Sequence, residues 1–228
     1  MKNLSEEEKL YLLSKIENDI PNKSEFSEDE LNILYKFSSD ENSNIRSYVA
    51  RILVDFTEEK GENILIKLTN DKDELVRAEA CDSLKESKSK CTYDLLANKA
   101  RFDNDEIVRG YSINSLGEIS LRLGLEKDTI DFLKTYLLKE ESVFIKINIF
   151  NALYILGNKE YLKEMIEILD TQIYQNRCAI INCLKEIVDK DNFKIIYEAL
   201  CIRESKENSY AVISAINNLK EFIKKKYF

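Results

Sequence analysis

The chain has 228 residues, of which 44% are hydrophobic and 33% charged, and its formal net charge is −8. No apolar run reaches the roughly 18 residues of a membrane-spanning helix, and the acidic N-terminus lacks the apolar core of a secretory signal. An acidic protein repels phosphate backbones, and the chain has no histidine, which is the commonest general base and metal ligand. We therefore expect no nucleic-acid or membrane partner, no metal, no cofactor and no catalytic residue.

The low content of proline and glycine favours a helical chain with short turns, and no linker rich in these residues divides it. Residues 1–45 contain 11 acidic side chains and 5 lysines, so they account for most of the negative charge. Terminal repeats of stacked-helix proteins need such a polar face. We therefore predict a single domain over residues 1–228, with acidic N-terminal capping helices in 1–40 and repeats in 41–228.

Two capping boxes begin the chain, because Ser5 is followed three residues later by Glu8, and Ser27 by Glu30. They predict one helix that ends near residue 18 and a second that carries Leu31 in its apolar stripe. The hydrophobic period then predicts helices near 41–57, 62–69, 73–87, 92–101, 105–122, 127–139, 142–156, 159–169, 172–189, 192–203 and 207–225. We expect Gly61, Gly124 and Gly157 at helix ends.

One motif recurs in every second helix and is clearest in 71–84, DKDELVRAEACDSL, and in 103–116, DNDEIVRGYSINSL. In each, the first aspartate is expected to cap the helix, with a glutamate three residues later. A basic residue follows the first apolar residue, and this position recurs every 31 to 37 residues as Arg46, Arg77, Arg109, Lys146 and Arg177, with Val212 in the last copy. A period of this length indicates a helical solenoid. We place the extra residues of the longest step in the turn around 122–127.

This motif resembles the HEAT repeat, in particular the bacterial type found in phycobilisome lyases. The resemblance implies an all-α fold, a right-handed α-solenoid of about six HEAT-like helix pairs. It also implies that the recurring arginine packs along the solenoid and meets aspartate or carbonyl groups of a neighbouring repeat. Asp71 and Asp103 are the candidate partners.

The resemblance also implies that the second helices line the concave side. Residues two before, two after, five after and nine after each basic position share one stripe of these helices. We predict that this stripe binds a partner through aromatic anchors, amides and carboxylates. The candidate residues are Tyr48, Asp82, Glu86, Tyr111, Asn114, Glu118, Phe144, Asn151, Asn182, Glu186, Tyr210 and Asn217. The alternative is a solvated helix face whose asparagines bond between neighbouring helices.

These features favour a non-enzymatic binding protein whose acidic groove holds a basic segment of a protein partner and which is a monomer when free. An immunity-type inhibitor of a toxin is one such protein. The alternatives are a repeat-family enzyme or accessory factor, lyase-like or related to DNA repair, and a structural subunit of a larger complex.

Two further features bear on location and on a second surface. The five cysteines show no C-x-x-C spacing, and Cys81 and Cys183 occupy helix positions that suit small buried side chains, as in a reducing cytoplasm. The sequence ends with the lysines 224–226, which suit the dipole at a helix C-terminus. The alternative for these lysines is a basic patch for a membrane or nucleic acid.

Overall fold

The computed structural model describes residues 4–55 and 59–227. Within these ranges the chain forms thirteen α-helices and short 3-10 turns, and no strand. None of the described helices combines the length and the apolar character needed to cross a membrane. The helices divide into two compact units, Met1–Leu125 and Glu126–Phe228, which we call unit 1 and unit 2 and describe in turn. The single-domain assignment stays a prediction.

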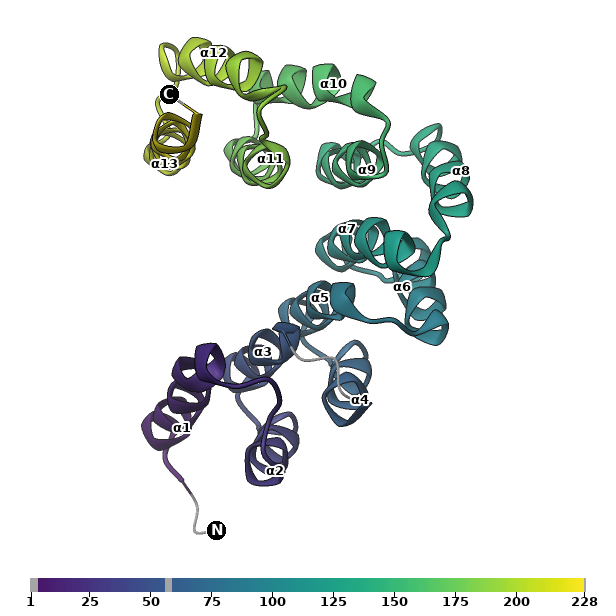
Figure 1. Ribbon diagram of the computed structural model, residues 1–228, viewed down its shortest axis with the longest axis vertical. Helices are drawn as coiled ribbons and strands as arrows, with labels where there is room; N and C mark the ends of the chain where they lie inside the picture. The colour runs from purple at the N-terminus through teal and green to yellow at the C-terminus, as the bar shows by residue number, and fades with distance from the viewer. Residues whose placement is uncertain (1–3, 56–58, 228) are drawn as a thin grey trace. The chain divides into compact units, whose positions relative to one another are not determined.

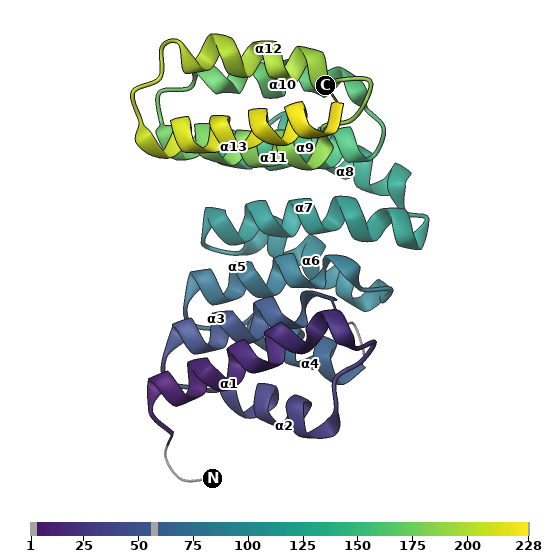
Figure 2. The same ribbon diagram turned by 60° about the vertical axis from the view of Figure 1, so that its left-hand side comes forward.

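Unit 1 has two layers of helices (Figures 1 and 2). One layer contains the first helix and the second helices of each pair: α1 (Glu6–Asp19), α3 (Ser43–Ile52), α5 (Glu74–Ser83) and α7 (Glu106–Leu123). The other layer contains α2 (Glu28–Phe37), α4 (Glu59–Leu68) and α6 (Lys90–Phe102). Helix α5 packs against both α3 and α7, so the second helices form a continuous row.

Unit 2 repeats the same arrangement (Figure 2). Its second helices are α9 (Val143–Ile155), α11 (Tyr174–Ile187) and α13 (Tyr210–Tyr227), and α11 packs between the other two. Its first helices are α8 (Glu126–Leu137), α10 (Leu162–Glu167) and α12 (Phe193–Glu204). The six pairs from α2–α3 to α12–α13 agree with the predicted number.

The recurring apolar residues form the core, as predicted from their period. In unit 1 the residues Val76, Ala80 and Leu84 of one motif have no solvent exposure. In unit 2 the equivalent Ile180 and Leu184 lie in a cluster with residues of α9, α10, α12 and α13. Cys81 and Cys183 are both buried free thiols, as expected. Burial of these apolar surfaces is the main favourable term for stacking one repeat on the next.

The predicted helix caps are confirmed at two sites and wrong at two. Ser5 and Ser27 form complete capping boxes. Asp71 and Asp103, however, do not cap α5 and α7, because Asp73 and Asp105 accept hydrogen bonds from the first helical amides instead. Each motif offers two aspartates two residues apart, and the structure uses the second as the cap.

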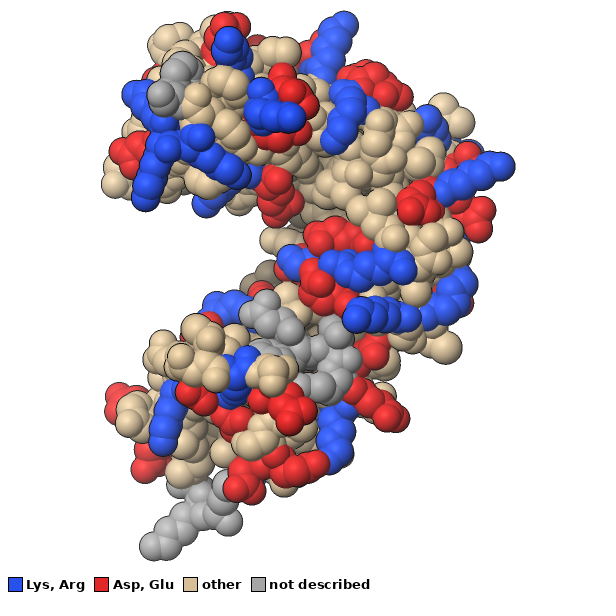
Figure 3. Space-filling view, viewed as in Figure 1, with Lys and Arg blue, Asp and Glu red and all other residues tan. Residues whose placement is uncertain are grey.

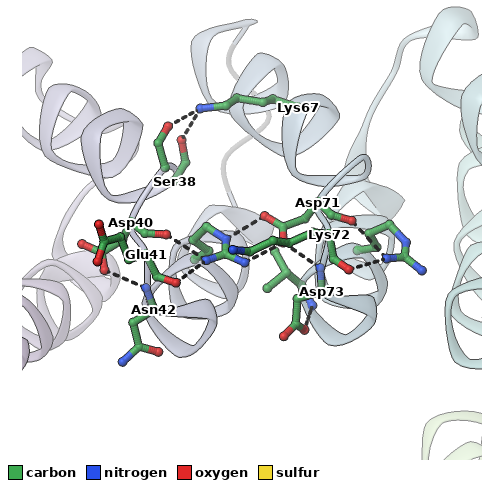
Figure 4. A network of polar contacts seen from close by, with 12 residues as sticks. Ser38, Asp40, Glu41, Asn42, Lys67, Asp71, Lys72 and Asp73 are labelled. Carbon is green, nitrogen blue, oxygen red and sulfur yellow. Dashed lines mark hydrogen bonds and ion pairs between the residues drawn. The ribbon is translucent and has the colours of Figure 1, made fainter.

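The first aspartate of each motif binds the arginine of the preceding repeat, as the resemblance implied. Arg46, only 4% exposed, donates from Nε and Nη2 to the two carboxylate oxygens of Asp71, each at 2.7 Å. Its Nη1 donates to the carbonyls of Asp40 and Glu41 (Figure 4). Arg77 contacts Asp103 in the same way, at 3.1 and 3.0 Å. These bidentate pairs fix one repeat against the next.

The glycine and turn predictions are partly wrong. Gly124 (φ 67°) and Gly157 (φ 96°) do adopt the left-handed conformation that glycine favours, each just after a helix. Gly61 instead lies buried inside α4. The extra residues of the longest repeat do not form a longer turn, because α7 continues to Leu123. They lengthen the helix instead.

Candidate functional site

Five of the candidate residues in unit 1 lie on α5, on the turn after it and on α7. Tyr111, Asn114 and Glu118 are spaced by three and four residues along α7, so they share one side of that helix. Asp82 lies on α5 and Glu86 on the 3-10 turn that follows it. The hydroxyl of Ser115 on α7 donates to the carbonyl of Asp82 at 3.5 Å, which joins the two rows. Tyr111 is 40% exposed, so its ring is accessible.

Helix α1 extends this surface at Tyr48 of α3. The Tyr48 hydroxyl donates to Glu17 Oε2 at 2.5 Å. The guanidinium of Arg51 stacks over the Tyr48 ring at 4.6 Å from its centroid and lies 3.7 Å from Glu17. Glu17 was not among the candidate residues, because it lies 31 residues before Tyr48 and outside the repeated motif. We call the surface formed by Glu17, Tyr48, Glu79, Asp82, Glu86, Tyr111, Asn114 and Glu118 the acidic face.

The acidic face also contains cations, which pair with some of its carboxylates. Arg122 binds Glu86 through Nη2 at 2.6 Å and donates from Nη1 to the carbonyl of Lys85 at the same distance. Lys85 in turn lies 3.5 Å from Asp82. Carboxylates still outnumber cations on this surface. The ion pairs hold Glu86 and Asp82 in fixed positions rather than free in solvent.

The environment of Glu79 disfavours its ionised form. Burial raises its pKa, and the nearby negative charge of Asp82 raises it further. Arg51 and Lys85 lower the pKa but do not compensate fully. Glu79 was in the predicted stripe but not among the candidate residues. A cationic group placed beside Glu79 would stabilise its ionised form, so this part of the surface favours a positively charged group of a binding partner.

The candidate residues of unit 2 lie on its second helices but differ in exposure. Tyr210 at the start of α13 is 86% exposed, and Asn182, Glu186 and Asn217 are also exposed. Phe144 at the start of α9 is half-buried, and its carbonyl accepts a hydrogen bond from Asn148 at 2.7 Å. These residues give unit 2 a polar and aromatic face with fewer carboxylates than unit 1.

Asn151 differs from the other candidates, because it is only 1% exposed. Its amide nitrogen donates to Glu186 of α11 at 3.3 Å, so it bonds between neighbouring helices. This is the alternative that the sequence left open for the asparagines. Asn151 therefore cannot contact a partner directly, although it orients Glu186, which is exposed.

Comparisons with known proteins agree with this architecture. Residues 31–117 match the sequence profile of HEAT repeats. That range begins inside α2 and ends inside α7, so it covers the most regular part of unit 1. No curated protein matches the chain in sequence.

A solved structure matches nearly the whole chain. The structure of the complex of CpcE and CpcF of phycocyanin lyase from Nostoc sp. PCC7120 contains a chain with a TM-score of 0.62 and 17% sequence identity to this one. The match covers 97% of this chain and 91% of that chain. At this identity the match establishes the fold, an all-α solenoid.

The match corrects one prediction. The absence of histidine led to the expectation that the chain is not an enzyme. The matched structure is that of a lyase, so this fold can form part of an enzyme, and the expectation was wrong. Features that exclude some enzyme classes do not exclude all of them, because function depends on the site and not on the fold.

The repeated Arg–Asp pairs, the two-layer stacking, the profile match and the shared fold lead to one conclusion. Residues 31–117 contain HEAT repeats, and the chain has the fold of a HEAT-like helical-repeat solenoid.

Proposed function

We propose that unit 1 binds a basic segment of a protein partner on its acidic face. The observation that supports this proposal best is the excess of carboxylates over cations on the acidic face, where burial and Asp82 both raise the pKa of Glu79. A lysine or arginine from a partner would relieve this repulsion. Tyr111 offers an exposed ring beside the carboxylates, and tyrosine is among the residues that contribute most to protein interfaces.

The partner-contacting residues of this proposal are Tyr48, Asp82, Glu86, Tyr111, Asn114 and Glu118. The carboxylates would steer a cationic segment toward the surface, and the tyrosines would contact its aliphatic stems. Phe144, Asn182, Glu186, Tyr210 and Asn217 of unit 2 stay a predicted second contact surface. Asn151 is left out, because it is buried.

A fluorescein-labelled oligo-lysine peptide is a direct probe of the acidic face. We expect the Tyr111→Ala, Glu118→Lys double variant to bind it at least about tenfold more weakly in fluorescence anisotropy, which corresponds to about 1.4 kcal/mol. The matched control is Tyr35→Ala, Glu28→Lys, which changes an exposed tyrosine and an exposed glutamate on α2 in the other layer of unit 1. If both variants lose affinity equally, the attraction is due to net charge and the proposal is wrong.

Within this proposal, an immunity-type inhibitor of a cationic toxin is one role that an acidic binding surface fits. The net charge of −8 supports it. Co-expression with a toxin encoded beside the gene would test it: growth should be rescued by the natural chain and not by the Tyr111→Ala, Glu118→Lys variant. Equal rescue by both would contradict a role for the acidic face in inhibition.

A second candidate is a subunit of a lyase-like assembly of two helical-repeat chains. The match to a complex of CpcE and CpcF over 97% of this chain favours it. Co-purification of this chain with a second helical-repeat chain from its own cell would support it. A partner that is itself not a repeat protein would favour the basic-segment proposal.

A further inference from the structure

Unit 2 has a second charged surface, and its charge is positive, opposite to that of the acidic face. The last turn of α13 contains Lys224, Lys225 and Lys226, and all three are exposed. Lys194 of α12 is exposed as well. Figure 3 shows lysine and arginine side chains gathered over the end of α13. We call Lys194 and Lys224–Lys226 the lysine patch.

The lysine patch is built on fixed aromatic rings. Lys226 Nζ lies 5.2 Å from the centroid of the Phe222 ring and 5.3 Å from that of Tyr227. Tyr227 stacks on Phe193 of α12 at 5.1 Å and donates its hydroxyl to the carbonyl of Val188 at 3.0 Å. These contacts hold the last turn of α13 against α12. The lysines therefore project from an ordered helix end, and the rings beside them add apolar contact area.

The fold does not neutralise this charge. The carboxyl end of a helix carries about half a negative charge, which offsets only part of one lysine. Lys220, one turn earlier, binds Glu204 at 2.5 Å. Among the described residues, Lys194 and Lys224–Lys226 have no carboxylate within ion-pair distance. A surplus of positive charge is thus concentrated on one end of a protein whose net charge is −8.

We propose that the lysine patch binds a short acidic segment of a protein. The patch is compact, because Glu221 on α13, Glu198 on α12 and the paired Glu204 limit its extent. A nucleic acid or a membrane surface extends far beyond such a patch and would meet these carboxylates and the acidic remainder of the chain. A short run of aspartate and glutamate would meet only the lysines. Lysine ammonium groups on flexible stems adapt to separate carboxylates as single charges.

The test uses a fluorescein-labelled oligo-glutamate peptide and the whole chain in low salt. We expect the Lys224→Glu, Lys225→Glu, Lys226→Glu variant to bind at least about tenfold more weakly, since three attractive charges are replaced by repulsive ones. The matched control is Lys134→Glu, Lys139→Glu, Lys163→Glu, which changes net charge equally at exposed lysines elsewhere in unit 2. The control should bind within about twofold of the natural chain.

Three further measurements separate loss of charge from loss of folding, and an acidic protein segment from a nucleic acid or a membrane. The Lys224→Gln, Lys225→Gln, Lys226→Gln variant avoids placing acids at the helix end, and it should also lose affinity while unfolding like the natural chain. Absence of peptide binding by the natural chain would overturn the proposal, as would an equal loss in the control. Tighter, patch-dependent binding of oligo-uridine or of phosphatidylserine vesicles would overturn the choice of an acidic protein segment.

Discussion

Both units join successive repeats through an ion pair of a recurring arginine, but the acidic partner differs between them. In unit 1, Arg46 and Arg77 each bind an aspartate 25 or 26 residues later with nearly the same geometry. In unit 2, Arg177 binds Glu207, which lies 30 residues later. The longer side chain of glutamate thus accompanies the longer sequence separation between the two partners. The recurring position therefore specifies a contact between repeats, and the residues between the two partners decide which acid can make it.

The pair in unit 2 is also more heavily bonded. Glu207 accepts from Arg177 at 2.8 and 3.0 Å, from Arg203 at 2.9 Å, and from the amides of Asn208 and Ser209. Burial raises its pKa, but the hydrogen bonds from Arg177, the two amides and Arg203 lower it to about 2. In unit 1, burial likewise raises the pKa of Asp71 and Asp103, and the arginines hold both values below the usual range.

The largest expected effect is the loss of folding free energy at acid pH, because the pKa of Glu207 is lowered so far. A carboxylate whose folded-state pKa is lower than its unfolded-state pKa stabilises the fold above the unfolded value, and this stability is lost as the pH falls. The loss should begin near the ordinary glutamate value of 4.5 and, for Glu207, continue to about 2. Urea unfolding at a series of pH values would measure it. In Glu207→Gln the free energy of unfolding should fall less steeply across this window, and an unchanged slope would contradict the assignment.

Replacing Glu207 by alanine should destabilise the chain more than any other single substitution of these pairs. It leaves Arg177 with no carboxylate and Arg203 with only its 3.4 Å contact to Asp170, at a site where the Glu207 side chain has no solvent exposure. Breaking such a buried pair costs about 3–5 kcal/mol. Urea unfolding would measure the loss. The control is Glu198→Ala, an exposed glutamate on α12, and equal losses in the two variants would exclude a special role for Glu207.

The equivalent change in unit 1, Asp103→Ala, should cost less. Arg77 is more exposed than Arg177, so water can solvate its guanidinium better once the carboxylate is gone. We expect a loss of about 2 kcal/mol, between the values for surface and buried ion pairs. Asp94→Ala on α6 removes a surface pair with Lys90 and should cost below about 1 kcal/mol. An Asp103→Ala variant as stable as Asp94→Ala would show that the inter-repeat pair contributes little.

The sequence predicted local features well and contacts between helices less well. Helix positions, the caps at Ser5 and Ser27 and the buried stripe depend on spacing along one segment. Asp71 and Asp73 are both suitable caps by sequence, and the arginine of the preceding repeat decides which one is used. The burial of Asn151 depends on its neighbour α11, and the contact of Glu17 with Tyr48 joins different helices, so neither could be derived from one helix alone.

The smallest expected effect is a gain in stability when unit 2 receives an aspartate at the position that pairs with arginine in unit 1. Thr171 lies six residues before Arg177 and offers it a carbonyl, just as Asp71 does for Arg77. Its side chain has no carboxylate for Lys146 of the preceding repeat. Ile173, the residue before the first turn of α11, provides no side-chain cap, whereas Asp71 additionally accepts the amide of Asp73. An aspartate at position 171 could therefore accept the Ile173 amide and face Lys146.

We expect Thr171→Asp to raise the free energy of unfolding by about 1 kcal/mol, the sum expected for one amide bond and one partly exposed ion pair. Thr171→Asn can accept the same amide without the charge, so the difference between the two variants isolates the ion pair. That difference should shrink in high salt, because screening weakens exposed charges. If the two variants are equally stable in low salt, Lys146 does not occupy the place that arginine takes in unit 1, and the recurrence of the basic position in unit 2 would be one of sequence without the contact.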